Sequence, residues 1–254
     1  MATALVTGAS AGLGEEFAWQ LATAGHKLVV VARSRDRLSE LADVVTSATG
    51  KAVEVLAADL STPDGRETVA ARLSDDERPV SQLVNNAGFA TGKTFLGGTW
   101  EEEQQMLDVL VTAPARLTHA ALPGMIARGH GAVLNVSSIA AHLGDSTYAA
   151  HKRWVLDFTS ALAGQLRGTG VTATAVLPGL TRTEFHDKPG LDHYRADFPE
   201  AVWLSAEQVV SAALTGVRRG SVVVTPSLRY TAAGALARLT PKAVTRRMGS
   251  MSRQ

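Results

Sequence analysis

The sequence predicts an α/β domain in which helices cover both faces of a parallel sheet. Short β-favouring runs alternate with segments of helical period along most of the chain. One of these runs, Lys27–Ala32, is apolar almost throughout, as expected for a strand that is buried on both faces. Because strands that alternate with helices are joined by right-handed crossovers, this order favours a parallel sheet.

The expected strands are short apolar or β-favouring runs, several of which end at glycine, asparagine or serine. They are Thr3–Thr7, Lys27–Ala32, Ala52–Ala57, Gln82–Val84, Gly131–Val136, Val171–Leu177 and Ser221–Thr225.

The expected helices show apolar residues at helical spacing and carry signals at their ends. Leu38, Leu41 and Val45 form the apolar side of one helix, and Ser61–Asp64 combines a capping residue with a first-turn proline. The helices are a segment with Phe17 and Leu21 that Gly25 closes, then Arg33–Ala48, a helix starting at Ser61–Asp64, Trp100–Arg128 interrupted by Pro114, Thr147–Arg167, and Ser205–Arg219.

Length and composition predict one domain. The chain has 254 residues, of which 45% are hydrophobic, and no repeat or linker divides it. We therefore expect a single catalytic domain over residues 1–254. Prolines, a glycine and scattered aromatics indicate an irregular substrate lid at about 180–204, and a basic extension follows at about 226–254.

The charge of the chain is unevenly distributed. The net charge of +1 gives no argument for nucleic acid, and we expect no such partner. Beyond Glu207 there is no Asp or Glu, so the last 47 residues carry +8 and the first 207 carry −7. This asymmetry indicates an anionic partner for the C-terminal end, although a solvated helix face is the alternative we favour.

The absence of cysteine excludes disulfides and Cys-ligated metal, and we expect no metal site. The chain starts without a basic segment or cleavage site, and no apolar run is long enough to cross a bilayer. We therefore expect a cytoplasmic protein.

A glycine-rich turn after the first strand carries chemistry through its backbone. Gly8, Gly12 and Gly14 follow the strand and open a helix. Glycines let a phosphate approach closely, and the helix N-terminus supplies free N–H groups and a positive dipole end. The spacing alone fits any glycine-rich turn, but its position favours a phosphate site. The expected contacts are Gly8, Ser10, Ala11, Gly12, Leu13 and Gly14.

The end of the second strand predicts the form of the cofactor. An acidic residue there would accept a hydrogen bond from a free ribose 2′-hydroxyl, whereas an arginine suits a 2′-phosphate. Arg33 occupies this position, with Ser34, Arg35 and Arg37 close by. The alternative is that these arginines are solvated. The positive end of the helix dipole does not favour basic side chains at the start of a helix, so another role has to explain these arginines. We therefore favour NADP(H).

Tyr148 and Lys152 are four residues apart in an expected helix, so both side chains project from one face. The ammonium favours phenolate and lowers the tyrosine pKa, which makes the pair an acid–base unit. Ser138 stands upstream and can bind the same substrate oxygen. Taken alone, the pair also fits a solvated lysine beside a half-buried tyrosine.

These motifs follow one another in an order that resembles the short-chain dehydrogenase/reductase family over essentially the whole chain. The matching residues are Thr7-Gly8-x-x-x-Gly12-x-Gly14, Asn85-Asn86-Ala87-Gly88, a serine before Tyr148-x-x-x-Lys152, and Pro178-Gly179-x-x-x-Thr183. The resemblance implies a Rossmann-like, doubly wound sheet of about seven strands, with the cofactor across their carboxyl ends.

The resemblance also implies the roles of individual residues. Tyr148 would be the acid or base on the substrate oxygen, Ser138 would orient that oxygen, and Lys152 would hold the nicotinamide ribose. Further implied contacts are Asp59 and Leu60 near the adenine, Asn86, Ala87 and Gly88 along the cofactor, and Pro178, Gly179, Thr181 and Thr183 at the nicotinamide carboxamide or the diphosphate.

Two departures from the family pattern stand near the catalytic pair. Leu110 occupies the position of the family's catalytic asparagine, whose main-chain carbonyl is thought to hold a relay water. Pro114 has no N–H to offer that carbonyl, so our hypothesis is that Pro114 preserves the relay without asparagine. The ten-residue gap from Ser138 to Tyr148 is shorter than usual, which leaves Ser137 as an alternative orienting residue.

We therefore expect an oxidoreductase that transfers hydride between NADP(H) and a carbonyl or secondary alcohol, similar to the ketoacyl and hydroxysteroid reductase branch. The aromatic lid favours an apolar substrate. The alternative is an NADPH-binding regulator with weak or lost catalysis. Expected partners are the small substrate and a second copy in a homo-oligomer, with an anionic membrane or acyl-carrier surface as options for the basic C-terminus.

Overall fold

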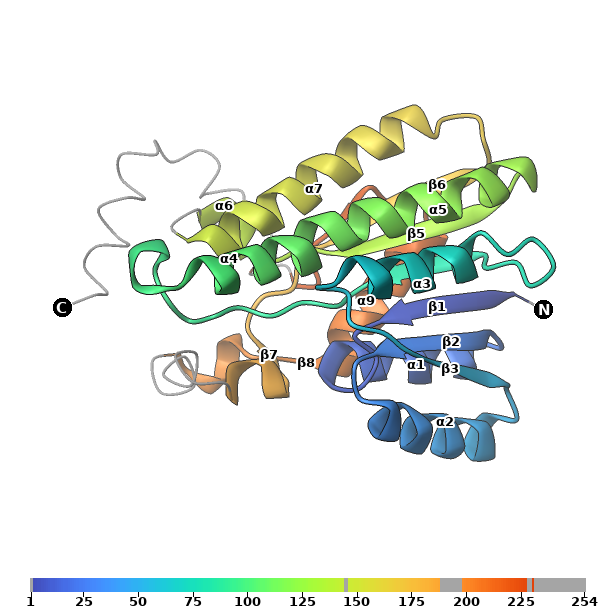
Figure 1. Cartoon of the computed structure of the whole chain (residues 1–254), viewed down its shortest axis with the longest axis horizontal. Helices are drawn as coiled ribbons and strands as arrows, with labels where there is room; N and C mark the ends of the chain where they lie inside the picture. Colours follow the sequence, from blue (N-terminus) through green and yellow to red (C-terminus); the bar gives the residue numbers. More distant parts are fainter. Residues whose placement is uncertain (1, 144–145, 188–197, 228–229, 231–254) are drawn as a thin grey trace.

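The computed structural model describes residues 2–143, 146–187, 198–227 and 230 (Figure 1). Its centre is a seven-stranded sheet in the order β3-β2-β1-β4-β5-β6-β9, and every neighbouring pair is parallel. The strands are β1 (Thr3–Thr7), β2 (Lys27–Ala32), β3 (Val53–Ala57), β4 (Gln82–Asn85), β5 (Gly131–Val136), β6 (Val171–Val176) and β9 (Val223–Val224). The predicted doubly wound parallel sheet is confirmed.

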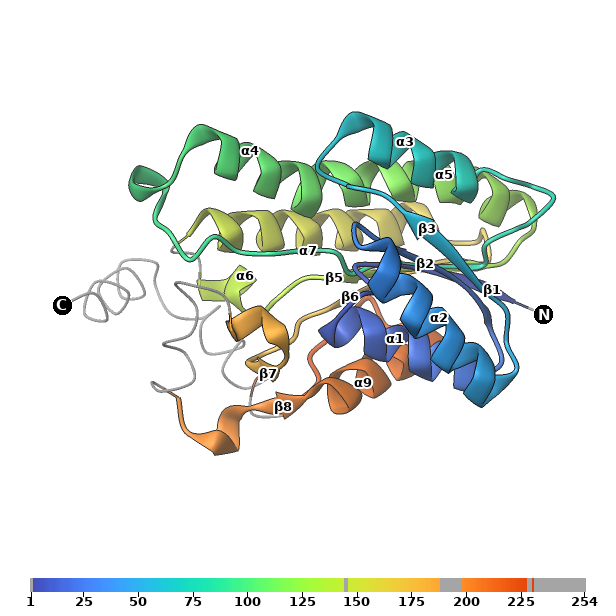
Figure 2. The same ribbon diagram turned by 60° about the horizontal axis from the view of Figure 1, so that its bottom comes forward.

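Helices cover both faces of this sheet, as predicted. Figures 1 and 2 show α3, α5 and α7 on one face, and α1, α2 and α9 on the other. The α-helices are α1 (Gly12–Thr23), α2 (Arg35–Thr49), α3 (Pro63–Leu73), α4 (Trp100–Leu107), α5 (Ala113–Ala127), α6 (Ala140–Leu143), α7 (Thr147–Gln165) and α9 (Ala206–Arg218).

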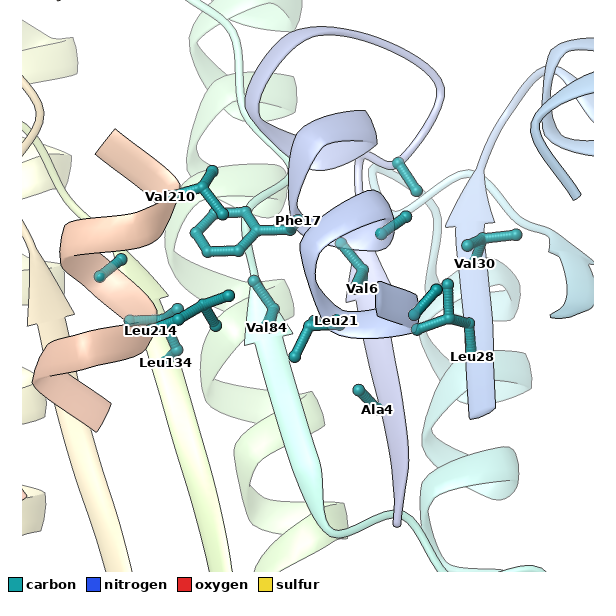
Figure 3. Packing of buried hydrophobic residues seen from close by; sticks show 14 of the residues in the cluster. Ala4, Val6, Phe17, Leu21, Leu28, Val30, Val84, Leu134, Val210 and Leu214 are labelled. Carbon is teal, nitrogen blue, oxygen red and sulfur yellow. The ribbon is translucent and has the colours of Figure 1, made fainter. Parts of the chain in front are cut away.

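Successive strand residues face opposite sides of the sheet and pack into two separate hydrophobic cores. Leu5 and Leu83 face the layer of α3, α5 and α7, whereas Val6 and Val84 face the layer of α1, α2 and α9. Phe17 of α1 is fully buried and lies among side chains of β4 and α9 in the second core (Figure 3). Every central strand is therefore apolar on both sides, which explains the continuous apolar runs in the sequence.

The strand order reverses between β1 and β4, and this reversal positions the candidate site. From β1 the chain winds outward to β2 and β3, then returns to β4 and winds the other way. In Figure 1 the arrow of β1 points toward the end of the molecule where α6 and β7 (Thr181–Arg182) lie. Ligands of such sheets bind outside the carboxyl ends of the strands at this switch point.

The long helix expected at residues 100–128 is broken by a π turn at Asp108–Thr112. The Ala113 N–H donates to the carbonyl of Asp108, five residues back. The predicted interruption at Pro114 therefore takes the form of a widened turn directly before the proline. A proline ring crowds the carbonyl four residues earlier, and a π turn relieves that contact.

The predicted lid is more regular than expected where it is described. β7 pairs in parallel with β8 (Leu204–Ser205), and single-turn 3₁₀ helices occur at Glu184–Asp187 and Glu200–Val202. A further 3₁₀ turn, outside the lid, occurs at Phe95–Gly97. Residues 188–197 of the lid, and 228–229 and 231–254 of the basic extension, lie outside the described residues. Within the described chain, no helix is both long and apolar enough to cross a membrane.

Candidate active site

The glycine turn after β1 forms a cradle that side chains would fill. Gly8 and Gly12 have φ values of +67° and +59°, in the left-handed region that favours glycine. A Cβ on Gly14 would lie 1.9 Å from the carbonyl oxygen of Gly8. No side chain caps α1 at Ala11, so its first N–H groups point to the turn. This backbone suits a diphosphate.

Two side chains fasten this turn to the end of β4. Thr7 Oγ1 accepts the N–H groups of Asn86 and Ala87, each at 3.0 Å. The side-chain amide of Asn86 donates to the carbonyls of Thr7 (2.9 Å) and Gly8 (3.3 Å). The Asn86 side chain therefore holds the two loops together, and the exposed Gly88 backbone is left for a ligand. Thr7 belongs to the motif noted from the sequence, but the motif did not indicate that its hydroxyl binds the loop after β4.

The predicted adenosine end gathers at the carboxyl ends of β2 and β3. Arg33 is exposed there, while the Ser34 hydroxyl caps α2 by accepting the Arg37 N–H at 3.4 Å. The Arg37 guanidinium lies 3.3 Å from the Glu184 carboxylate. Asp59 Oδ1 accepts both the N–H and the hydroxyl of Ser61. Of the basic residues named from the sequence, Arg33 is thus exposed, whereas Arg37 is paired with Glu184.

Leu60 and Thr181 have buried side chains. Leu60 packs into the core beneath α3, so any cofactor contact from it would come from its backbone. The Thr181 hydroxyl donates to the carbonyl of Gly179 at 3.0 Å. Thr183 lies directly beside the glycine turn, because a Cβ on Gly12 would be 3.1 Å from the Thr183 Cβ. This position fits the predicted contact of Thr183 with the diphosphate.

The end of β5 and helix α7 are tied by two reciprocal hydrogen bonds. Lys152 Nζ donates to the carbonyl of Val136 at 2.7 Å, and the Ser137 hydroxyl donates to the carbonyl of Lys152 at 2.7 Å. Ser137 is 2% exposed. Ser138 is half-buried, and its Oγ accepts the Ala140 N–H at 3.1 Å. Ser137 therefore serves the structure, which favours Ser138 as the orienting residue.

Tyr148 and Lys152 share one face of α7. Lys152 Nζ lies 5.7 Å from the centre of the Tyr148 ring. The Tyr148 ring is half-buried, and the Phe185 ring lies beside it with 6.0 Å between ring centres. The Lys152 side chain is buried, and this burial lowers the pKa of its ammonium from 10.5 to about 8.

Leu110 lies next to this pair, within the π turn. It is 1% exposed, and a Cβ on Gly88 would lie 2.9 Å from Leu110 Cδ2 and 3.5 Å from Lys152 Nζ. The Leu110 methyl group and the Lys152 ammonium therefore flank the same position beside Gly88.

One contact near the site was not foreseen from the sequence. The Tyr230 ring covers Gly179, where a Cβ would lie 2.2 Å from the ring. Its hydroxyl accepts the Leu180 N–H at 3.1 Å and donates to the carbonyl of Val202 at 2.8 Å. Tyr230 thus joins the two arms of the lid. In the described part of the chain, no group of three His, Asp or Glu residues is arranged to hold a metal ion.

Comparison with known proteins places this geometry in a family. A family model described as short chain dehydrogenase matches residues 2–192. A serine 3-dehydrogenase of Agrobacterium fabrum is 35% identical over 187 residues, which cover 72% of this chain and 73% of that protein. This chain belongs to the short-chain dehydrogenase family.

Two further similarities agree with this membership. A short chain dehydrogenase of Pseudocercospora fijiensis is 37% identical over 191 residues, which are 72% of this chain and 60% of that protein. The structure of a short-chain dehydrogenase from Sphingobium yanoikuyae in complex with NADPH has a TM-score of 0.85 and 36% identity, and the match covers 99% of this chain and 96% of that one. The predicted family and fold are confirmed.

Replacing Gly14 with alanine should abolish NADPH binding, because the added Cβ would overlap the Gly8 carbonyl and force the turn open. Gly164→Ala in α7 is the matched control, since nothing lies within 4 Å of its Cβ position. The control should raise stability by about 0.4–1 kcal/mol and leave binding unchanged. Fluorescence titration with NADPH and thermal unfolding measure both variants. Tight binding by Gly14→Ala would contradict the assignment of the turn.

Proposed function

We propose that this chain transfers hydride between NADP(H) and a carbonyl or secondary alcohol, with Tyr148 as the group that gives or takes the proton. The observation that carries the proposal is the Tyr148 ring beside the enclosed Lys152 ammonium on α7. Both lie next to the end of β5 and the loop of Gly88, at the switch point of the sheet.

The cofactor is NADP(H), as predicted, and the chain is an oxidoreductase of its family. The NADPH complex of the Sphingobium relative and the family match both support this conclusion. The residues present fit the cofactor, because the cradle at Gly8, Gly12 and Gly14 has no room for side chains. We assign Arg33 to the 2′-phosphate, since its exposed guanidinium stands at the end of β2.

NADPH, when bound, supplies the hydride. The chain's own residues then act on the substrate oxygen and its proton. The Tyr148 hydroxyl donates the proton during reduction, and the Ser138 hydroxyl holds the same oxygen. The Lys152 ammonium stabilises negative charge that develops on the Tyr148 oxygen, and its burial strengthens this interaction. Oxidation of an alcohol reverses each of these roles.

The proposed substrate is an apolar carbonyl compound of the lipid, acyl or steroid kind. The Phe185 ring stands beside Tyr148, so an apolar group attached to the carbonyl would meet an aromatic wall. Phe198 and Trp203 belong to the same lid segment. The Agrobacterium relative is called a serine 3-dehydrogenase, so family membership alone does not select apolar substrates.

Three expectations from the sequence remain predictions. They are the cytoplasmic localisation, assembly into a homo-oligomer, and contact of the basic C-terminus with an anionic membrane or acyl carrier. That C-terminus lies largely outside the described residues. The regulator alternative rests on Leu110 alone, and the activity assay below decides between it and the oxidoreductase.

Tyr148→Phe should abolish NADPH consumption with carbonyl substrates and leave NADPH binding largely intact, because only the proton donor is removed. A panel of apolar and polar carbonyls, assayed with NADPH and NADH in parallel, provides the parent activity. We expect the parent to prefer NADPH and apolar ketones. Substantial activity of Tyr148→Phe would refute the role of the phenol, and a parent inactive on the whole panel would favour the regulator.

Pro114→Ala should reduce turnover by about tenfold or more while the chain still folds and binds NADPH. The alanine N–H can close an α-helical bond to the carbonyl of Leu110, which would remove an acceptor for a relay water. Pro123→Ala is a matched control, because Pro123 lies on the exposed side of the same α5 helix. The control should keep full turnover. Equal turnover of Pro114→Ala and the parent would show that the proline has no part in proton transfer.

A further inference from the structure

An arginine of α3 contacts two neighbouring segments, one assigned to the adenine and the other leading to Leu110. Arg66 Nη1 donates to the carbonyls of Leu60 and Ser61, each at 3.0 Å. The same nitrogen lies 3.3 Å from the Asp108 carboxylate. The side chains of Arg66 and Asp108 are only 11% and 17% exposed. One guanidinium therefore contacts both the loop after β3 and the start of the π turn.

On one side, Arg66 donates hydrogen bonds to the loop assigned to the adenine. Asp59 Oδ1 already binds Ser61, and the Asp59 carbonyl accepts the N–H and hydroxyl of Thr62. A Cβ on Gly65 would lie 2.0 Å from that carbonyl oxygen, so the first turn of α3 packs tightly on the loop. The Leu60 and Ser61 carbonyls take their hydrogen bonds from Arg66. The loop is thus held by the helix that carries this arginine.

On the other side, Arg66 fixes the residue at which the π turn begins. Asp108 Oδ2 accepts the side-chain amide of Gln104 at 3.1 Å, and its carbonyl accepts the Ala113 N–H. Leu110 lies two residues further, and its methyl group and Lys152 Nζ both border the position that a Cβ on Gly88 would take. A shift of Asp108 would therefore move the turn that carries Leu110.

A neighbouring ion pair between α3 and α5 provides a comparison for the contact of Arg66 with Asp108. Arg116 of α5 pairs with Glu67 of α3 at 2.7 Å, with side chains 37% and 61% exposed. Exposed pairs of this kind contribute little to stability. Removing one partner of an enclosed pair is far more disruptive, because the remaining charge stays without compensation.

We propose that Arg66 is a positioning residue that couples the adenine end of the cofactor site to the enclosure of Lys152. The proposal rests on the cofactor and catalytic sites assigned above. Without the guanidinium, the Leu60 and Ser61 carbonyls lose the Arg66 donor, and the Asp108 carboxylate keeps only the Gln104 amide. The π turn can then shift, Leu110 withdraws from Gly88, and water reaches the ammonium.

The effect of removing the Arg66 guanidinium should be measurable as a change in the pKa of Lys152. Burial lowers the pKa of its ammonium to about 8, so entry of water should raise that pKa. The titratable neighbours are Tyr148 on the same face of α7 and His151, whose own pKa is lowered by burial and by the Lys152 charge. Neither is altered by a substitution at Arg66.

The test is an NMR titration of ¹³C-labelled lysine side chains in the full chain, with the Lys152 signal assigned through its loss in Lys152→Met. In Arg66→Gln the pKa of Lys152 should rise by about one unit. The dissociation constant for NADPH should also rise, by about tenfold, because the adenine loop loses a charged donor. Arg116→Gln is the matched control, and it should leave both quantities at the parent values.

An unchanged pKa of Lys152 in Arg66→Gln would overturn the proposal, and so would an equal rise in Arg116→Gln. If Arg66→Gln does not fold, Asp108→Asn removes the charge at nearly constant volume and should raise the same pKa; an unshifted signal there also overturns the coupling. The lysine titration needs no turnover. Failure of the proposed function would appear separately, as a parent that consumes no NADPH with any carbonyl.

Discussion

The enclosure of one ammonium group is the constraint on which the site depends. Lys152 is 5% exposed, and its pKa is about 8 instead of 10.5. At neutral pH this shift costs the folded state about 3 kcal/mol. Between pH 8 and 10.5 the unfolded chain binds more protons than the folded one, so the free energy of unfolding should rise with pH in that window. Below pH 8 the full cost remains. A fold that tolerates this cost retains a charge that can act on a neighbouring phenol.

The surrounding elements each hold that charge in place. The Val136 carbonyl accepts a hydrogen bond from its Nζ, and the Ser137 hydroxyl donates to the carbonyl of the same lysine. Leu110 of the π turn lies on the other side of the Gly88 position. The strand order brings these parts to the switch point, where the glycine turn after β1 and the loop after β4 are fastened together. The proposed phosphate cradle and the proposed acid–base pair therefore both follow from one topology.

The sequence predicts the parts of this arrangement that depend on local patterns. Glycine spacing after a strand identifies the cradle, and the four-residue separation of Tyr148 and Lys152 places them on one face of α7. Contacts between residues distant in the chain leave no such pattern. The hydrogen bonds of Thr7 join residues about 80 positions apart, and the Tyr230 hydroxyl reaches a backbone N–H 50 positions away. The sequence also placed the break of the long helix at Pro114, whereas the turn that accommodates its ring lies just before it.

We propose that Lys152, which the family resemblance expects to hold the nicotinamide ribose, binds the cofactor as an ammonium and loses its proton near pH 8. The most direct measurement is the dissociation constant of NADPH as a function of pH in Tyr148→Phe, which keeps the ring beside the lysine and removes the other titrating group. Binding should weaken as the pH rises through about 8, and Lys152→Met should bind weakly without this dependence. Binding that stays constant from pH 7 to well above 9, or that weakens only near the ordinary lysine pKa of about 10.4, would contradict the account.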